Sequence, residues 1–174
     1  MSKDRHRRHF IKSIAAGGTV ALTSWPVLAV PKAEDALAPG CRVFTVSQAA
    51  LVGAIVEQIV PADDYPGAKE AGVVEFIDGI LAGPFGKFYK ERYERGLRTI
   101  DEVSQARFAG HFVALNSDQQ GSILKALESD NGENSIRREF FGLIVQHTFE
   151  GYYGDPQHGG NRGGASWRMI GFGG

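Results

Sequence analysis

Apolar side chains recur with the period of an α-helix along most of the chain between residues 45 and 150. The first run of apolar positions is Leu51, Val52, Ile55, Val56 and Ile59. These positions share one face of a helix, since an α-helix turns once every 3.6 residues. Thr45 or Ser47 is suited to cap this helix at its amino terminus, and Pro61 ends it. The pattern predicts an amphipathic helix packed on a core.

Four further segments show the same periodicity, and no segment alternates apolar and polar residues as a half-buried strand does. The second and third helices are expected at residues 68–80 and 87–108. A short fourth helix follows Ser117, which forms a capping-box pattern with Gln120. The last helix is expected at residues 135–150.

The predicted fold class is therefore all-α, with about five helices in a small domain over residues 45–150. In the last helix, the side chains that fall on the apolar face are Ile136, Phe140, Ile144 and His147. A histidine on such a face is expected to be a hydrogen-bonded core residue rather than a metal ligand.

Residues 151–174 differ from the rest of the chain because they combine many glycines with aromatic side chains. Each glycine costs a helix about 1 kcal/mol relative to alanine, so this extension is not expected to be helical. Its large apolar side chains are Tyr152, Tyr153, Trp167, Met169, Ile170 and Phe172. They would expose much apolar surface if the segment were a solvated linker. We therefore expect the extension to lie against a surface.

The amino-terminal residues 1–29 have the features of an export signal. Arg7 and Arg8 are followed by Phe10 and by a weakly apolar run that ends in small residues at Ala29. This pattern predicts a twin-arginine signal peptide cut after Ala29, with residues 30–44 as a linker. Two alternatives are a basic arm for nucleic acid and a signal that stays uncleaved and anchors the protein.

Charge argues against nucleic acid as a partner. The whole chain has a formal net charge of −1, but residues 1–29 hold five of its 19 basic side chains and only one of its 20 acidic ones. The remainder therefore carries a net charge of about −5, whereas a surface that binds DNA or RNA is basic.

No catalytic or metal-binding motif is evident in the sequence. Cys41 is the only cysteine, which excludes an internal disulfide, a cysteine-held iron–sulfur cluster and a c-type haem attachment. His111, His147 and His158 lack the spacing of a metal site. The glycine pairs at residues 159–160 and 163–164 follow no strand, so they do not indicate a dinucleotide site. We expect no catalytic residue, no metal and no cofactor in this chain.

An exported chain of this kind is expected to escort a folded partner that carries the cofactor.

The chain resembles subunit 3, the small subunit, of the gluconate 2-dehydrogenase family. The residues that carry the resemblance are Ile59 to Asp64, Pro66 to Ala68, Ala71 to Val73, Gly96, Leu97, Arg107, Phe108, Gly151 to Tyr153, Asp155, Pro156, Gly159 to Arg162 and Trp167 to Phe172. The carboxyl-terminal motif is the most specific of these. The resemblance implies a heteromeric periplasmic dehydrogenase associated with the inner membrane.

In such a complex, the resemblance implies that a large subunit binds FAD and oxidises a sugar or sugar acid, and that a cytochrome c subunit accepts the electrons. The small subunit supplies the signal for the twin-arginine translocase and stabilises the large one. Gly163 to Ser166 stand where gluconate-type members tend to carry an acidic residue. A small subunit of a glucoside 3-dehydrogenase-type complex is therefore an alternative, and a stand-alone periplasmic binding or scaffold domain is another.

The carboxyl-terminal extension is the expected docking site for the large subunit. The expected docking residues are Tyr152, Tyr153, Asp155, Asn161, Arg162, Trp167 and Arg168. Tyr152, Tyr153 and Trp167 would be buried anchors, and Arg162 and Arg168 would pair with carboxylates. His158 and Asn161 are candidates for the substrate entrance. The alternative is that the extension closes the chain's own helical core.

Overall fold

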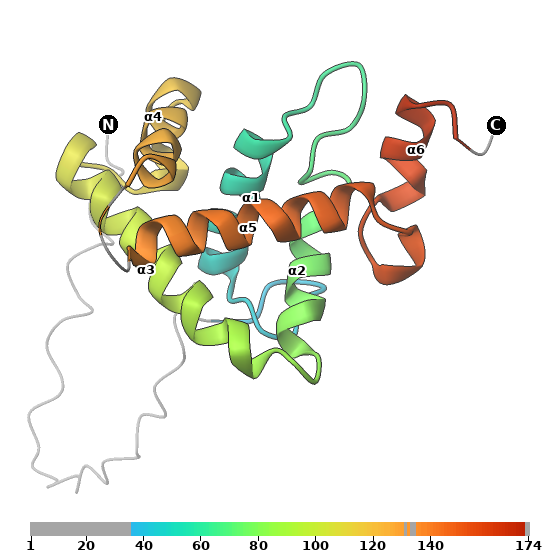
Figure 1. The fold of residues 1–174 in the computed structure, drawn as a ribbon, viewed down its shortest axis with the longest axis horizontal. Coiled ribbons are helices and arrows are strands. Elements are labelled where there is room, and N and C mark those ends of the chain that lie inside the picture. The colour runs from blue at the N-terminus through green and yellow to red at the C-terminus, as the bar shows by residue number, and fades with distance from the viewer. Residues whose placement is uncertain (1–35, 131, 133–134, 173–174) are drawn as a thin grey trace, which may run out of the picture. The chain divides into compact units, whose positions relative to one another are not determined.

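The computed structural model describes residues 36–130, 132 and 135–172, and the predicted signal at Arg7, Arg8 and Phe10 lies outside them. The described residues form six α-helices and three short 3₁₀ helices, with no strand beyond an isolated bridge between Leu37 and Thr45. This confirms the all-α prediction. In Figure 1, α5 (Ile136–Tyr153) lies along the middle of the helices, and it contacts α1, α2, α3, α4 and α6.

Helix α1 (Val46–Ile59) is the first predicted helix, and Thr45 is its cap. The Thr45 hydroxyl accepts a hydrogen bond from the backbone N–H of Gln48, while the Gln48 side chain accepts one from the N–H of Thr45. This reciprocal pair is a capping box, which satisfies two amide groups that the first turn leaves free. Val52, Ile55 and Val56 are buried in the core.

Helix α2 (Val73–Ala82) begins five residues later than the expected residue 68. Residues 68–72 form turns instead, and Gly72 adopts a left-handed conformation with φ of 81° that a helix interior does not allow. Ala68 and Ala71 are buried all the same. Because these two apolar side chains continue the periodic pattern of α2, the sequence predicted a helix that starts too early.

Residues 36–44, the second half of the predicted linker, pack on the domain through Asp78 of α2. The Asp78 carboxylate accepts hydrogen bonds from the backbone N–H groups of Arg42, Val43 and Phe44 at 2.7–2.8 Å. Asp78 and Phe44 are both buried. One buried carboxylate thus satisfies three consecutive backbone N–H groups in a segment of turns and bends.

Helices α3 (Lys87–Phe108) and α4 (Ser117–Glu128) occupy the predicted segments. A short 3₁₀ helix, η2 (Phe112–Ala114), joins them. The predicted cap of α4 was one residue late: Asn116 is the cap, and its capping box is closed by Gln119 rather than Gln120. The Gln120 side chain is buried instead and donates to the carbonyl of Phe112.

Helix α5 buries Phe140, Ile144 and His147 as expected, but Ile136 in its first turn is exposed. The helix also passes the predicted boundary at residue 150 and continues through Gly151 to Tyr153. A Cβ atom at Gly151 would lie 2.7 Å from the ring of Phe76, so glycine lets α5 pack closely on α2. This packing offsets the low helix propensity of glycine at that position.

The remainder of the extension is also more regular than expected. It contains η3 (Pro156–His158), η4 (Arg162–Gly164) and the short helix α6 (Ala165–Met169), which lies near the end of α5 in Figure 1. The expectation that residues 151–174 contain no helix was wrong. Its glycines at residues 159, 163, 164 and 171 have positive φ, and two of them, Gly163 and Gly164, lie within η4.

Candidate functional site

The inner side of the carboxyl-terminal extension is part of the core. Tyr152 is 2% exposed, and its hydroxyl donates a hydrogen bond of 2.8 Å to the carbonyl of Pro66. Ala165 and Ser166 of α6 are buried as well. On this inner side, the extension closes the chain's own core, which was the alternative to docking. Tyr152 therefore has little exposed surface to offer a partner.

Asn161 fastens the extension from within. It is fully buried, with φ of 44°, and its backbone N–H donates to the carbonyl of Gly151 at 2.7 Å. Its side-chain amide donates to the carbonyl of Gly154 and accepts from the N–H of Ser166, both at 2.9 Å. These three bonds tie the end of α5 to the start of α6. The Asn161 side chain is therefore enclosed within this chain.

The charged residues predicted for docking already have partners within the chain. The guanidinium of Arg162 forms an exposed ion pair with Glu75 at 3.4 Å, and that of Arg168 donates to the carbonyl of Gly163. The Asp155 carboxylate caps η3 by accepting from the backbone N–H of Gln157 at 2.9 Å. All three side chains lie at the surface, where such interactions contribute little and exchange readily.

The outer side of the extension carries a row of aromatic rings, which we call the aromatic ridge: Phe149, Tyr153, Trp167 and Phe172. The rings of Phe149 and Tyr153 lie 6.0 Å apart, and those of Trp167 and Phe172 lie 5.1 Å apart edge to face. The Trp167 indole N–H donates to the carbonyl of Tyr153 at 3.3 Å, which links the two pairs.

Most of the ridge is open to solvent: Phe149 is 45%, Tyr153 50% and Phe172 60% exposed. Ile170 of the same segment is also exposed. Clustered aromatic side chains of this kind mark protein interfaces. Sequence reasoning missed Phe149, although its spacing of four residues from Tyr153 places both on one face of a helix.

A cleft of about 540 Å³ lies beside the extension, between α2, the turn into α3, α5 and η3. Among its lining residues are Arg42, Tyr89, Gln146, His147, Glu150 and His158. Of the two residues predicted at a substrate entrance, the structure places His158 on this cleft and encloses Asn161. The other polar lining residues escaped sequence reasoning because α5, α2 and the segment before α1 are brought together only by the fold.

His147, which lines the cleft, forms a buried pair with Tyr93. The Tyr93 hydroxyl and the Nδ1 atom of His147 are 2.9 Å apart, and the two rings are stacked. Burial lowers the pKa of His147, against an opposing effect of Glu150. Burial, together with Glu150, also raises the pKa of Tyr93 far above its ordinary range. Both side chains are therefore neutral near pH 7.

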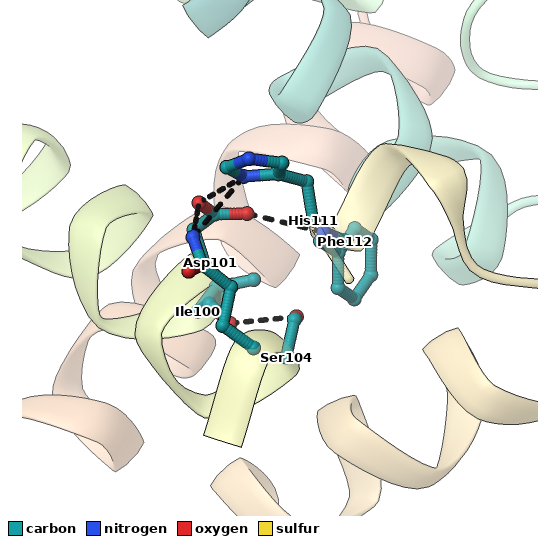
Figure 2. A network of polar contacts seen from close by, with 6 residues as sticks. Ile100, Asp101, Ser104, His111 and Phe112 are labelled. Atoms are coloured by element: carbon teal, nitrogen blue, oxygen red, sulfur yellow. Dashed lines mark hydrogen bonds and ion pairs between the residues drawn. The ribbon is translucent and has the colours of Figure 1, made fainter. Parts of the chain in front are cut away.

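A second polar network lies on α3, away from the extension. Figure 2 shows Asp101 and His111 turned toward each other, with the carboxylate 2.7 Å from Nδ1 of the imidazole. The Asp101 carboxylate also accepts from the Gln105 amide at 3.0 Å and from the backbone N–H of Phe112 at 3.1 Å. Burial alone would raise the pKa of Asp101, but these hydrogen bonds lower it below its usual value. The network anchors η2 to α3.

Cys41 has no property of a reactive thiol. It is partly buried, and burial together with Asp78 and Glu75 raises its pKa to about 11. Near neutral pH the thiol is protonated, and the thiolate is the nucleophilic form.

In the part of the chain that the structure describes, no group of three or more His, Cys, Asp or Glu side chains is arranged to hold a metal ion. None of the helices in this part has both the length and the apolar content needed to cross a bilayer.

Comparison with known proteins gives one match. The model of the family described as gluconate 2-dehydrogenase subunit 3 matches residues 46–174, from the first residue of α1 to the end of the sequence. Neither the curated proteins nor the solved structures include a significant match to the chain. The match covers every helix described above, including the extension, the aromatic ridge and most of the cleft.

Proposed function

The chain belongs to the gluconate 2-dehydrogenase subunit 3 family, and we propose that it is the small subunit of a periplasmic, FAD-dependent sugar or sugar-acid dehydrogenase. The family is that of a subunit of a multi-subunit dehydrogenase, so the chain is an accessory subunit beside a larger catalytic partner. The proposal adds the compartment, the cofactor of the partner and the class of substrate.

Export is proposed from the sequence of residues 1–29, with Arg7, Arg8 and Phe10 as the part that the twin-arginine translocase reads. The translocase carries folded proteins, so a partner without a signal can travel while it is bound to this chain. FAD is assigned to the partner because the glycine pairs at residues 159–160 and 163–164 lie after η3 and within η4, and they follow no strand. A cytochrome c subunit completes the complex and takes the electrons.

The aromatic ridge carries the proposal that the extension docks on the large subunit. The four rings form two contacting pairs, which are joined by the hydrogen bond from the Trp167 indole to the carbonyl of Tyr153. Three of the four side chains are about half exposed. An accessory subunit needs a surface for its catalytic partner, and buried aromatic side chains dominate the binding energy of such interfaces. Tyr153 and Trp167 are the anchors in this proposal, together with Phe149.

The other predicted docking residues have supporting roles. Tyr152 and Asn161 hold the ridge in place from inside the core. Arg162, Arg168 and Asp155 border the ridge in sequence, and their exposed charges are available to pair with charges of the large subunit. Because these charges lie at the rim, we expect them to affect the rate of association more than the final affinity.

Co-purification tests the proposal. An affinity-tagged full chain is expressed in its native host and purified from the periplasm. Its companions are identified by mass spectrometry, and bound flavin by its absorbance spectrum. We expect a flavoprotein that oxidises a sugar or sugar acid. Combining Tyr153→Ala with Trp167→Ala should release most of this flavoprotein, since each lost anchor costs about 2 kcal/mol or more of binding.

The matched control combines Leu37→Ala with Phe88→Ala, which removes two exposed apolar side chains outside the ridge. This control should keep the flavoprotein bound. Circular dichroism of both double variants should show unchanged helical content. A tagged chain that is purified alone, or a flavoprotein that stays bound when Tyr153 and Trp167 are truncated, would contradict the proposed docking surface.

A further inference from the structure

The cleft between α2, α5 and η3 has the size and the lining of a small-molecule site. Its volume of about 540 Å³ lies within the usual range of ligand pockets. Its walls include the rings of Phe76, Phe85 and Tyr89. Aromatic rings provide flat apolar faces on which the C–H groups of a ligand pack. The aromatic ridge does not include these residues.

The charged groups of the cleft leave hydrogen-bonding capacity unused. The guanidinium of Arg42 lies over α2, where a Cβ atom at Gly79 would come within 3.6 Å of it. Among the described residues no carboxylate pairs with this guanidinium. One oxygen of Glu150 accepts from the Gln146 amide at 2.8 Å, which leaves its other oxygen as an acceptor. The cleft therefore offers both donors and acceptors.

His147 adds a built donor to the cleft wall. It is 3% exposed, and its Nδ1 atom is the hydrogen-bond partner that the structure gives to the buried Tyr93 hydroxyl. Since Tyr93 keeps its proton and finds no other acceptor among the described side chains and carbonyls, its hydroxyl donates to Nδ1. A neutral imidazole that accepts at Nδ1 carries its proton on Nε2. This N–H has no partner among the described residues, and His147 lines the cleft.

We propose that this cleft binds a neutral pyranose sugar. Hydroxyl groups both donate and accept, so they match a set of Arg42, Glu150, Gln146 and the Nε2–H of His147. Arg42 and Glu150 carry opposite charges that offset each other in the cleft, so a neutral ligand fits better than an anion, and the charged rim disfavours a purely apolar ligand. The ring face of a pyranose is suited to pack on Tyr89 or Phe76.

This inference rests on the proposed function in one respect, which is the reason for binding a sugar. A subunit of a sugar dehydrogenase would use the cleft to gather substrate next to the catalytic subunit. Its physical basis is independent of the partner, because each cleft residue belongs to this chain. The inference and the proposed function can therefore fail separately.

The test is a titration of the ¹⁵N-labelled full chain with methyl β-D-glucopyranoside, followed by amide and imidazole NMR signals. We expect saturable shifts at Gly79, Gly83 and the His147 ring, all of which lie on the cleft. Glu150→Gln should weaken binding about tenfold, because it replaces a charged acceptor by a neutral one. Gluconate, as an anion, should bind more weakly than the neutral glucoside.

The matched control is Glu128→Gln, which removes an exposed carboxylate at the end of α4, outside the cleft. It should leave the affinity unchanged. If Glu150→Gln disturbs the fold, Arg42→Gln replaces it, since Arg42 is exposed and its side chain has no ion-pair partner to lose among the described residues. Shifts that do not saturate, shifts away from the cleft, equal binding of gluconate, or unchanged affinity in the cleft variants would each overturn the inference. Retention of the flavoprotein in the same chain would then show that the proposed function stands without it.

Discussion

Tyr152 and Tyr153 follow each other at the end of α5, yet the helix turns one ring into the core and the other toward solvent. Tyr152 packs under the extension and bonds to the carbonyl of Pro66, while Tyr153 belongs to the aromatic ridge. The same division separates Asn161, which is enclosed, from Arg162, which is exposed. The inner side of the extension holds the fold together, and the outer side is the surface that we propose for the partner. Substitutions on the two sides should therefore affect different measurements.

The largest expected effect on stability is that of Tyr152→Ala. Truncating a large buried aromatic side chain costs about 3–5 kcal/mol, and here a hydrogen bond is lost as well. Tyr153→Ala, the matched control, should change the free energy of unfolding by less than about 1 kcal/mol. Urea denaturation followed by circular dichroism measures both. Equal losses of stability in the two variants would contradict the division into an inner and an outer side.

Asn161→Ala should have the next largest effect. The substitution leaves the carbonyl of Gly154 and the backbone N–H of Ser166 without their side-chain partners in a buried region. It also places alanine at a positive φ. We expect a loss of about 2–4 kcal/mol of unfolding free energy.

In the Asn161→Ala variant, hydrogen exchange should also become faster in α6 than in α3. Asn161→Gly serves as the control, since it removes the same hydrogen bonds but tolerates the positive φ. A glycine variant that is no more stable than the alanine variant would show that backbone strain contributes nothing.

The sequence was sufficient to predict the core helices because their apolar positions repeat over several turns. Val52, Ile55, Phe140 and Ile144 are buried where the periodicity placed them. The extension was harder to predict from the sequence, since its helix α6 is a single short turn and its structure depends on Asn161 and Ser166 meeting across five residues. Glycine content alone suggested an irregular segment, whereas tertiary packing on α2 made Gly151 helical.

The candidate site was predictable only in part, because it too depends on tertiary packing. Tyr153 and Trp167 were identified from their residue type, and the structure places both on the ridge. The cleft combines Arg42, which precedes α1, with Gln146 and Glu150 of α5 and His158 of η3. Only the packing of α2 against α5 brings these side chains to one cleft. No local pattern indicates such a meeting of distant side chains.

A smaller effect is expected from pH through His147, on the inner face of α5. Burial lowers the pKa of His147 in the folded protein, so the unfolded chain binds a proton first as the pH falls. The neutral histidine therefore contributes stability above the ordinary pKa of about 6.5, and this contribution is lost as the pH falls through the lower folded value. The slope should not exceed about 1.4 kcal/mol per pH unit. Unfolding free energies measured from pH 7.5 to 5 by urea titration test this dependence.

The control for this prediction is His158→Gln, which removes an exposed histidine of the same cleft. It should leave the pH dependence in place, whereas His147→Gln should flatten it. A flat profile for the unsubstituted chain would show that the pKa of His147 is the same in the folded and unfolded protein, and it would contradict this prediction.

The smallest effect is expected on the outer side, from the ion pair between Arg162 and Glu75. The two groups are 3.4 Å apart and largely solvated, so Arg162→Gln should change the unfolding free energy by less than about 1 kcal/mol. Salt should weaken even this contribution, because the pair is exposed to screening ions. The same variant should slow association with the flavoprotein at low ionic strength, if the rim charges steer docking as proposed. A loss of stability as large as that of Asn161→Ala would place Arg162 among the residues that hold the extension, and it would remove the distinction between its two sides.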